Sequence, residues 1–287
     1  MGWRPPLSVE LAREMGFCFG VRRAIRILEA AVQRYGPLES LGPVVHNQQV
    51  VARLEGLGVR VAHGVKEVRA TVVAVTAHGI APGVMDQLKE QARQVVDATC
   101  PLVRRAQRAA RDLAQEGFRV VVFGDPGHPE VVGVLGWAGD AALAVQSIPL
   151  ALQPWPKRLG LLAQTTQVPE DFARFISSAL PVALSGESEL RVVNTICGPT
   201  RRRRAAAREL ARRCQLVLVV GDPKSANTRR LAQLCSAQVE TRLVERSEDI
   251  DPAWLRGKET IGITAGASTP DEAIHQVVRR AKELIEN

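Results

Sequence analysis

The chain has 287 residues, 46% of them hydrophobic and 24% charged, and its formal net charge is +8. This composition is typical of a globular protein with a sizeable core, and it excludes an intrinsically disordered chain. No apolar run reaches the roughly 18 residues needed to span a membrane, and the first residues lack the apolar segment of a signal peptide, so we expect a cytoplasmic protein without a membrane partner.

Three sequence phrases recur in the same order, three times along the chain. The first is a cysteine before an Arg/Ala-rich helical stretch: Cys18 in GFCFGVRRAIR, Cys100 in ATCPLVRRAQR and Cys197 in TICGPTRRRRA. The second places His46 in GPVVHN, His128 in GDPGHPE and Ser225 in GDPKSAN after a strand. The third is an apolar strand, a polar turn and a proline: VVAVTAHGIAP, LGLLAQTTQVP and IGITAGASTP.

The spacing of these phrases shows that whole segments of the chain are repeated, and not only the cysteines. The step from Cys18 to Cys100 equals that from His46 to His128 (100 − 18 and 128 − 46, both 82). The steps from Cys100 to Cys197 and from His128 to Ser225 are equal again, at 97 residues (197 − 100, 225 − 128). A repeat of this length sets the architecture. We predict three lobes, 8–93, 94–190 and 191–287.

Each lobe reads as strand, turn and helix repeated three times. VVVFGDPGHP and LVLVVGDPKS contain the continuous apolar runs of strands buried on both faces, whereas LVRRAQRAARDLAQ has helical spacing. This alternation predicts parallel α/β units, in which ligands bind at the carboxyl ends of the strands. We therefore expect a trefoil-like α/β fold, with three pseudo-threefold-related lobes around a central site where the three thiols meet.

Three convergent thiolates are compatible with two kinds of metal site. A zinc ion would take a histidine of the second phrase as its fourth ligand, whereas a [4Fe–4S] cluster would leave one iron open to a substrate oxygen. Threefold symmetry favours the cluster, and three buried thiols inherited by duplication are the structural alternative. Cys214 and Cys235 lie outside the phrase, and we expect them to be buried small residues.

Six polar residues of the second and third phrases lie at strand-to-helix turns, where helix N-termini favour anions. They predict a phosphate or diphosphate site, with local helix capping as the alternative: His46, His78, His128, Ser225, Asn227 and Ser268. No P-loop or GxGxxG fingerprint follows any strand, so a nucleotide cofactor is not supported.

Glu130 is a carboxylate in an apolar context at the site end of a strand. It is either a surface or capping residue or a proton donor whose pKa is raised by burial. Thr165 and Thr166 are expected to face the same centre, where they would relay a proton or bind a substrate hydroxyl.

Nine motifs in order resemble the 4-hydroxy-3-methylbut-2-enyl diphosphate reductase family, also called IspH or LytB: GFCFGVRRA, VVHN, TAHG, DATCPLV, GHPEVVG, QTT, NTIC, SAN and AGASTP. The resemblance runs from about Gly16 to Pro270. It implies reductive dehydroxylation of the allylic diphosphate to isopentenyl and dimethylallyl diphosphate, the last step of the methylerythritol phosphate pathway. It also implies an external electron donor such as ferredoxin or flavodoxin.

The resemblance assigns a role to each candidate residue. Cys18, Cys100 and Cys197 would hold the [4Fe–4S] cluster, and this decides cluster over zinc. Glu130, Thr165 and His128 would be catalytic. The diphosphate would be surrounded by His46, His78, His128, Ser225, Asn227 and Ser268, with Thr165 at the hydroxyl end. Ala226 stands where a second serine is usual, so one side-chain hydrogen bond to the diphosphate is lost.

Two other function classes are compatible with the repeat. A hydro-lyase with an open-iron cluster would dehydrate its substrate without a reductant. A cluster-bearing redox sensor would bind nucleic acid, and only the arginine runs support it. Aromatic residues, which would stack on bases, make up only 4% of the chain. Solvated helix faces are the favoured interpretation of the arginines, and we expect no nucleic-acid partner.

Overall fold

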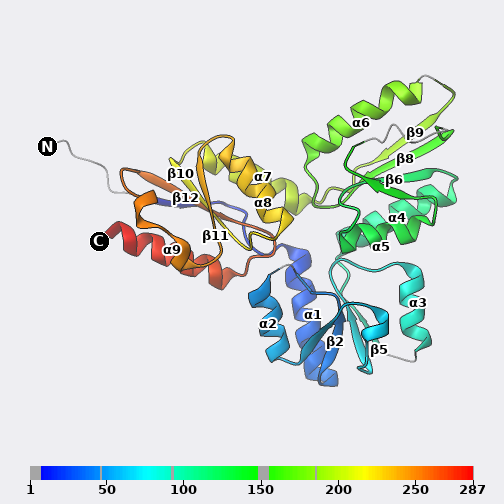
Figure 1. Cartoon of the computed structure of the whole chain (residues 1–287), viewed down its shortest axis with the longest axis horizontal. Coiled ribbons are helices and arrows are strands. Elements are labelled where there is room, and N and C mark those ends of the chain that lie inside the picture. Colours follow the sequence, from blue (N-terminus) through cyan, green and yellow to red (C-terminus); the bar gives the residue numbers. More distant parts are fainter. Residues whose placement is uncertain (1–7, 46, 92–93, 148–154, 185, 287) are drawn as a thin grey trace. The chain divides into compact units, whose positions relative to one another are not determined.

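The computed structural model describes residues 8–45, 47–91, 94–147, 155–184 and 186–286 (Figure 1). It contains three four-stranded parallel sheets, which confirms the three predicted α/β lobes. The chain divides into two compact units: the first comprises Met1–Arg22, Val45–Arg53 and Gly198–Asn287, and the second comprises Arg23–Val44 and Leu54–Cys197. Within the described residues, no helix is long and apolar enough to cross a membrane.

Lobe 1, in the second unit, is built on a sheet with the strand order β3-β2-β4-β5. Its strands are β2 (Leu38–Leu41), β3 (Val59–Ala62), β4 (Val72–Val75) and β5 (Gln94–Asp97). The helical segments of this part of the chain are α1 (Phe19–Tyr35), α2 (Gln48–Gly56), η1 (Val65–Glu67) and α3 (Pro82–Glu90), of which residues 19–22 and 48–53 belong to the first unit. All four residues of β4 are buried, as expected for a central strand covered on both faces.

Lobe 2, in the same unit, has the strand order β7-β6-β8-β9. Its strands are β6 (Arg119–Phe123), β7 (Leu143–Val145), β8 (Arg158–Ala163) and β9 (Glu189–Val193). Its helices are α4 (Pro101–Gln115), α5 (Pro129–Ala138) and α6 (Pro169–Leu184). On one face of the sheet, Phe123, Phe172 and Phe175 form an aromatic cluster with ring centroids 4.8–6.3 Å apart.

Lobe 3, in the first unit, has the strand order β1-β12-β10-β11. Its strands are β1 (Ser8–Leu11), β10 (Leu216–Val220), β11 (Glu240–Val244) and β12 (Thr260–Ala265). Its helical segments are α7 (Gly198–Ala211), α8 (Ala226–Ser236), η2 (Ser247–Asp249), η3 (Pro252–Trp254) and α9 (Asp271–Glu286). Cys214 and Cys235 pack in its core, which confirms the prediction for these two thiols.

The three sheets have the same internal order. The strand that precedes each cysteine lies at one edge and pairs with the third-phrase strand, which in turn pairs with the strand that leads into the second phrase. β1 therefore joins β12, β5 joins β4 and β9 joins β8. The predicted limits 8–93, 94–190 and 191–287 follow the repeat and not the sheets: they place β1 and β5 apart from the sheets to which these strands belong, and the limit at 190 divides β9.

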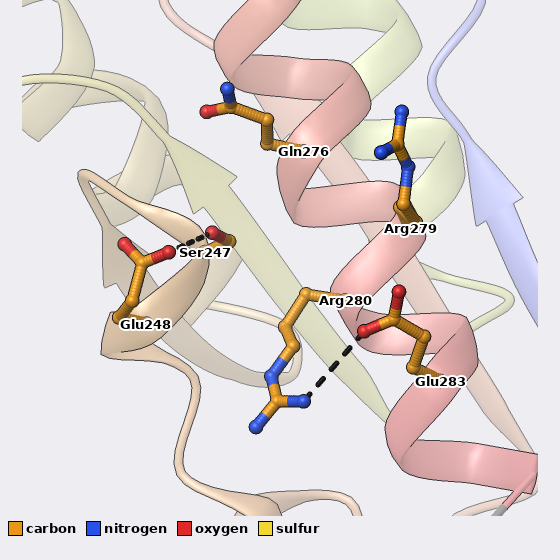
Figure 2. A pocket seen from close by; sticks show the side chains of 6 residues that line it. All are labelled: Ser247, Glu248, Gln276, Arg279, Arg280 and Glu283. Carbon is orange, nitrogen blue, oxygen red and sulfur yellow. Dashed lines mark hydrogen bonds and ion pairs between the residues drawn. The ribbon is translucent and has the colours of Figure 1, made fainter.

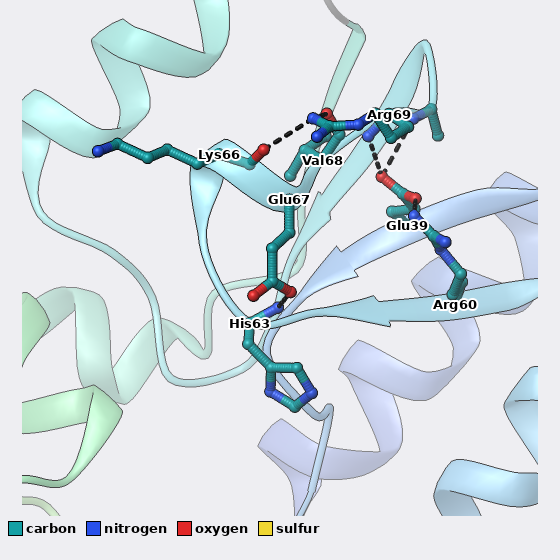
Figure 3. A network of polar contacts seen from close by, with 8 residues as sticks. Glu39, Arg60, His63, Lys66, Glu67, Val68 and Arg69 are labelled. Atoms are coloured by element: carbon teal, nitrogen blue, oxygen red, sulfur yellow. Dashed lines mark hydrogen bonds and ion pairs between the residues drawn. The ribbon is translucent and has the colours of Figure 1, made fainter.

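Glu39 is a buried carboxylate on β2, an inner strand of lobe 1 (Figure 3). It accepts the backbone N–H groups of Arg69 at 2.6 Å and Ala70 at 3.0 Å, and it pairs with the Arg60 guanidinium. Burial acts to raise the pKa of Glu39, but these three donors outweigh it and hold the pKa below its ordinary value. The carboxylate thus ties β2 to the loop before β4.

Replacement of Glu39 by glutamine should lower the free energy of unfolding at neutral pH by about 1–3 kcal/mol, because buried donors lose a charged acceptor. A depressed native pKa contributes stability that is present above the unfolded-state value and lost as the pH falls through the native value. The difference between variant and wild type should therefore shrink in acid. Urea unfolding measured at several pH values checks this.

The matched control is Glu67→Gln. Glu67 is exposed and accepts only the His63 N–H among the contacts drawn in Figure 3. A Glu67 effect as large as that of Glu39, or a Glu39 effect independent of pH, would contradict the assignment.

Candidate functional site

Each cysteine turn is fixed to the end of the neighbouring strand by a backbone hydrogen bond. Cys100 donates its N–H to Ala77 O at 3.0 Å, and Cys197 donates to Thr165 O at 2.9 Å. In lobe 3 the bond runs from Gly16 N–H, two residues before Cys18, to Ala265 O at 3.4 Å, at the end of β12. The acceptors lie at the ends of third-phrase strands or in the turns that follow them, so each cysteine turn is held beside a polar loop.

Local sequence shapes these turns in two ways. Asp97 and Asn194, each three residues before a cysteine, accept the N–H two residues further on, at 2.9 and 3.1 Å. Such Asx turns break the strand and start the helix. The Cys18 turn instead uses Gly16 at φ +69°, and a Cβ there would lie 2.8 Å from Ile274 Cδ1. Only glycine satisfies both the positive φ and the close packing at that position.

The cysteines are divided between the units. Cys18 belongs to the first unit, and Cys100 and Cys197 belong to the second. Cys100 and Cys197 are buried, Cys18 is half-buried, and none forms a disulfide. Across the described ranges, no three His, Cys, Asp or Glu side chains are gathered closely enough to hold a metal ion. Convergence of the three thiols stays a prediction.

A partly exposed ion pair lies beside the Cys18 turn. Arg22 binds Asp271 at the start of α9 through two hydrogen bonds of 2.7 and 2.8 Å, and its Nε donates to Phe17 O at 3.2 Å. The bond to Asp271 raises the pKa of Arg22, and the nearby Cys18 adds to this effect. The Arg22–Asp271 pair therefore ties the Cys18 turn to the start of α9.

In the second unit, two predicted site histidines lie together. The His78 and His128 rings are 5.4 Å apart and nearly perpendicular, at 80°. The N–H of Glu130 donates to His128 Nδ1 at 3.1 Å, because His128 caps helix α5. A neutral His128 therefore carries its proton on Nε2. Thr76 Oγ1 lies 3.2 Å from His78 Nδ1.

Helix α5 packs closely on the loop after His78. A Cβ at Gly136 would lie 2.3 Å from Ala81 Cβ, so this position has no room for a larger side chain, whereas a Cβ at Gly133 would make an ordinary contact of 3.5 Å with Gly79 O. Trp137 Nε1 also donates to Ile80 O at 3.0 Å. Gly136 and Trp137 thus join the helix that His128 caps to the loop after His78.

Glu130 and Thr165 form a buried pair. Glu130 is 2% exposed, and its carboxyl group accepts the Thr165 N–H at 2.6 Å and faces Thr165 Oγ1 at 2.8 Å. Burial raises the pKa of Glu130 above its ordinary range, and the hydrogen bonds from Thr165 offset only part of this. Because the Thr165 carbonyl also accepts the Cys197 N–H, this residue connects the carboxyl group to a cysteine turn. Thr166 is half-buried beside it.

In the first unit, Ser225 and Ser268 bring their hydroxyl oxygens to 3.5 Å from each other. Ser225 caps helix α8, with its Oγ 3.5 Å from the Thr228 N–H, and Ala226 begins the helix. Asn227 Nδ2 is buried and finds no hydrogen-bond partner within the described chain. A buried unpaired donor beside two weakly engaged hydroxyls at a helix N-terminus is the chemistry of an anion site. His46 lies outside the described residues.

A surface groove between η2 and α9 contains none of the predicted site residues (Figure 2). Its lining carries both charges: Ser247, Glu248, Gln276, Arg279, Arg280 and Glu283. Ser247 Oγ donates to Glu248 at 2.6 Å and Arg280 pairs with Glu283 at 3.7 Å, so charges of opposite sign partly neutralise each other there. This groove is not the candidate site.

The chain is similar to known proteins over nearly its whole length. The family described as LytB protein matches residues 9–282. The chain belongs to the LytB protein family. A 4-hydroxy-3-methylbut-2-enyl diphosphate reductase of Dehalococcoides mccartyi is 46% identical over 274 residues, covering 94% of this chain and 96% of the relative.

Two solved structures are similar to this member of the LytB family. One is (E)-4-hydroxy-3-methyl-but-2-enyl diphosphate reductase, described as the terminal enzyme of the non-mevalonate pathway, with a TM-score of 0.74, 35% identity and coverage of 96% of this chain and 99% of the other. The other is the E-1-hydroxy-2-methyl-but-2-enyl-4-diphosphate reductase of Plasmodium falciparum, with a TM-score of 0.85, 26% identity and coverage of 96% and 87%.

Sequence reasoning missed several residues that build the site of this LytB protein. Gly133 and Gly136 lie one helical turn apart in GVLGW, and that spacing of small residues was the available signal for close packing. Asp271 gave a weaker signal, as an acidic residue in the first turn of a helix. Several arginines assigned to solvated faces have internal partners instead, and Arg203 is 4% exposed.

Substitution of Gly136 by alanine should lower the free energy of unfolding by about 1–3 kcal/mol, because the new methyl group has no room beside Ala81. Gly83, an exposed helical glycine with open space around it, is the control. Gly83→Ala should stabilise the protein slightly, by about 0.5–1 kcal/mol. Urea unfolding of both variants checks this, and equal effects would show that Gly136 is not a packing contact.

Proposed function

We propose that this chain reduces 4-hydroxy-3-methylbut-2-enyl diphosphate to isopentenyl and dimethylallyl diphosphate, in the last step of the methylerythritol phosphate pathway. The reaction takes two electrons and two protons, breaks the allylic C–O bond and releases water. The buried Glu130–Thr165 pair is the observation that carries the proposal, because loss of a hydroxyl group needs a carboxylic acid that keeps its proton near neutral pH. The names of the relatives support the same substrate.

We further propose that Cys18, Cys100 and Cys197 together bind a [4Fe–4S] cluster. The donor set fits such a group: all three thiols are outside disulfides, and Cys100 is the N-cap of helix α4, where the helix dipole favours a thiolate. The bound cluster would supply electrons and a Lewis acid for the hydroxyl oxygen. Thiolate ligands alone are compatible with zinc, and the repeat favours the cluster.

The protein side chains would supply the proton and the orientation. Glu130 would donate its proton to the leaving hydroxyl oxygen, and Thr165 would hold that oxygen and the carboxyl group in one geometry. His128, with its proton on Nε2, would donate a hydrogen bond at the same end of the site. The low polarity around Glu130 strengthens each of these contacts, because water does not compete with them.

The diphosphate would be held by donors at helix N-termini. Ser225, Asn227 and Ser268 contribute two hydroxyls and one unpaired amide from lobe 3. His46, His78 and His128 complete the proposed set, and the N-terminus of α8 adds exposed backbone amides. These contacts would perform no chemistry, but they would orient the hydroxymethyl carbon toward the acid.

The electrons would come from an external protein, because no nucleotide-binding fingerprint appears in the sequence. An acidic donor such as ferredoxin or flavodoxin would match the net charge of +8. A cytoplasmic location stays a prediction.

Anaerobic purification followed by iron and sulfide analysis, EPR and dithionite-driven turnover of the diphosphate tests the proposal. About four irons per chain and both diphosphate products are the expected result. Zinc in place of iron would contradict the cluster, and turnover without a reductant would indicate a hydro-lyase instead.

Glu130→Gln should reduce turnover by about 100-fold or more, because an amide cannot deliver the proton. The pKa of Glu130 is raised, so the carboxyl group favours folding below its unfolded-state pKa, and this contribution is lost as the pH rises through the native pKa. The variant should therefore unfold at a higher urea concentration than wild type in alkaline buffer.

Glu170→Gln is the control, since Glu170 follows a proline at the start of α6 as Glu130 does in α5 but is exposed. Loss of activity in both variants would argue against a specific acid.

Ala226→Ser should lower the KM for the diphosphate several-fold with little change in kcat, because it adds a hydroxyl donor at the first residue of α8, remote from the reacting carbon. Steady-state kinetics with excess dithionite measure both constants. An unchanged KM would show that the position does not contact the diphosphate.

A further inference from the structure

Three arginines, each on the helix that follows a cysteine, donate to the backbone just before another cysteine. Arg23 on α1 donates from Nη1 to Thr99 O at 3.1 Å, and Thr99 precedes Cys100 directly. Arg105 on α4 donates from Nη2 to Asn194 O at 3.0 Å, three residues before Cys197. Arg203 on α7 donates from Nη2 to Gly16 O at 2.6 Å, two residues before Cys18. We call these three the clamp arginines.

The three contacts follow a closed order. The helix after Cys18 holds the turn of Cys100, the helix after Cys100 holds the turn of Cys197, and the helix after Cys197 holds the turn of Cys18. Each contact lies within one unit, the first two in the second unit and the third in the first. Each cysteine turn supplies a carbonyl oxygen to one clamp arginine and is followed by the helix that carries another. A displacement of one helix therefore acts on the next turn.

The clamp contacts complement the sheet contacts. Each turn has a backbone bond to the end of a third-phrase strand or to the turn that follows it, and in addition it accepts a hydrogen bond from a guanidinium. Hydrogen bonds from a charged donor are stronger than neutral ones, and the Arg203 contact is buried. A turn held on two sides loses little conformational freedom when its thiol binds a ligand, so less binding free energy is spent on ordering.

We propose that Arg23, Arg105 and Arg203 are positioning residues that pre-organise the three cysteine turns in cyclic order for binding one metal centre. The metal part of this inference rests on the proposed function. The clamp part, that each arginine holds the next cysteine turn, stands on the hydrogen bonds alone.

The test compares Arg23→Met, Arg105→Met and Arg203→Met with three exposed arginines of the same helices, changed to methionine as controls: Arg26, Arg108 and Arg201. Methionine keeps an unbranched apolar side chain and removes the donor. Because Arg203 is buried, Arg203→Lys is added as a variant that keeps the charge. Arg105 is exposed, and its variant is expected to fold normally.

Hydrogen exchange read by mass spectrometry reports on the turns themselves. Arg23→Met should increase exchange in the peptide that contains Cys100, Arg105→Met in that of Cys197, and Arg203→Met in that of Cys18. The control variants should leave these peptides unchanged. Increased exchange only in the mutated helix, or in none of the three turns, would overturn the clamp.

Anaerobic iron release from the purified holoenzyme to a chelator reports on the metal centre. Each clamp variant should release iron about tenfold faster than its control, as loss of one charge-assisted hydrogen bond predicts, and Arg203→Lys should recover part of the retention. Faster exchange with unchanged iron release would overturn the positioning role. A wild-type chain without iron would contradict the proposed function instead, and the exchange pattern would then decide the clamp on its own.

Discussion

The parallel pairing of each cysteine strand with a third-phrase strand is the constraint on which the site depends. It ends both strands at one edge, and a single backbone hydrogen bond then fixes the thiol turn beside the polar loop. Thr165 shows the consequence most fully. Its carbonyl accepts the Cys197 N–H, while its own N–H and hydroxyl bind Glu130. One residue therefore couples the proposed acid to a proposed cluster ligand, and neither can move without the other.

Much of this arrangement was predictable because the signals are local. Continuous apolar runs such as LVLVV identified the central strands, and the repeated turn chemistry identified the residues at their ends. The sheet that each strand joins could not be predicted in this way, because it depends on contacts between residues far apart in the sequence. Nothing within SVEL indicates that β1 pairs with β12, some 250 residues away in sequence, and the lobe limits drawn from the repeat placed β1 apart from its sheet as a result. The outer strands β3, β7 and β11 were likewise not predicted, because short edge strands with mixed burial have weak periodicity.

The distance between His78 and His128 has a cause that residue type alone does not reveal. A helix that begins at the second-phrase histidine must pack on the loop of the third-phrase histidine, and the separation of the two backbones is set by the smallest side chains between them. Gly136 removes such a side chain on the α5 face, where a Cβ would lie 2.3 Å from Ala81 Cβ. Glycine weakens a helix by about 1 kcal/mol relative to alanine, so Gly136 is consistent with close approach of helix and loop rather than with helix stability.

Net charge is a weaker guide to partners than it first appears, because it includes charges that the fold already uses. Arg203 is buried and donates to a backbone carbonyl, yet its charge counts toward the total of +8. Arginine suits such positions because its planar fork directs several donors at fixed angles and it keeps its charge when buried. The arginine runs that suggested nucleic acid in the sequence are therefore explained in part by the architecture of the cysteine turns. Attraction of an acidic electron donor would depend on the remaining exposed cations, whose field falls off within about 10 Å at 0.1 M salt.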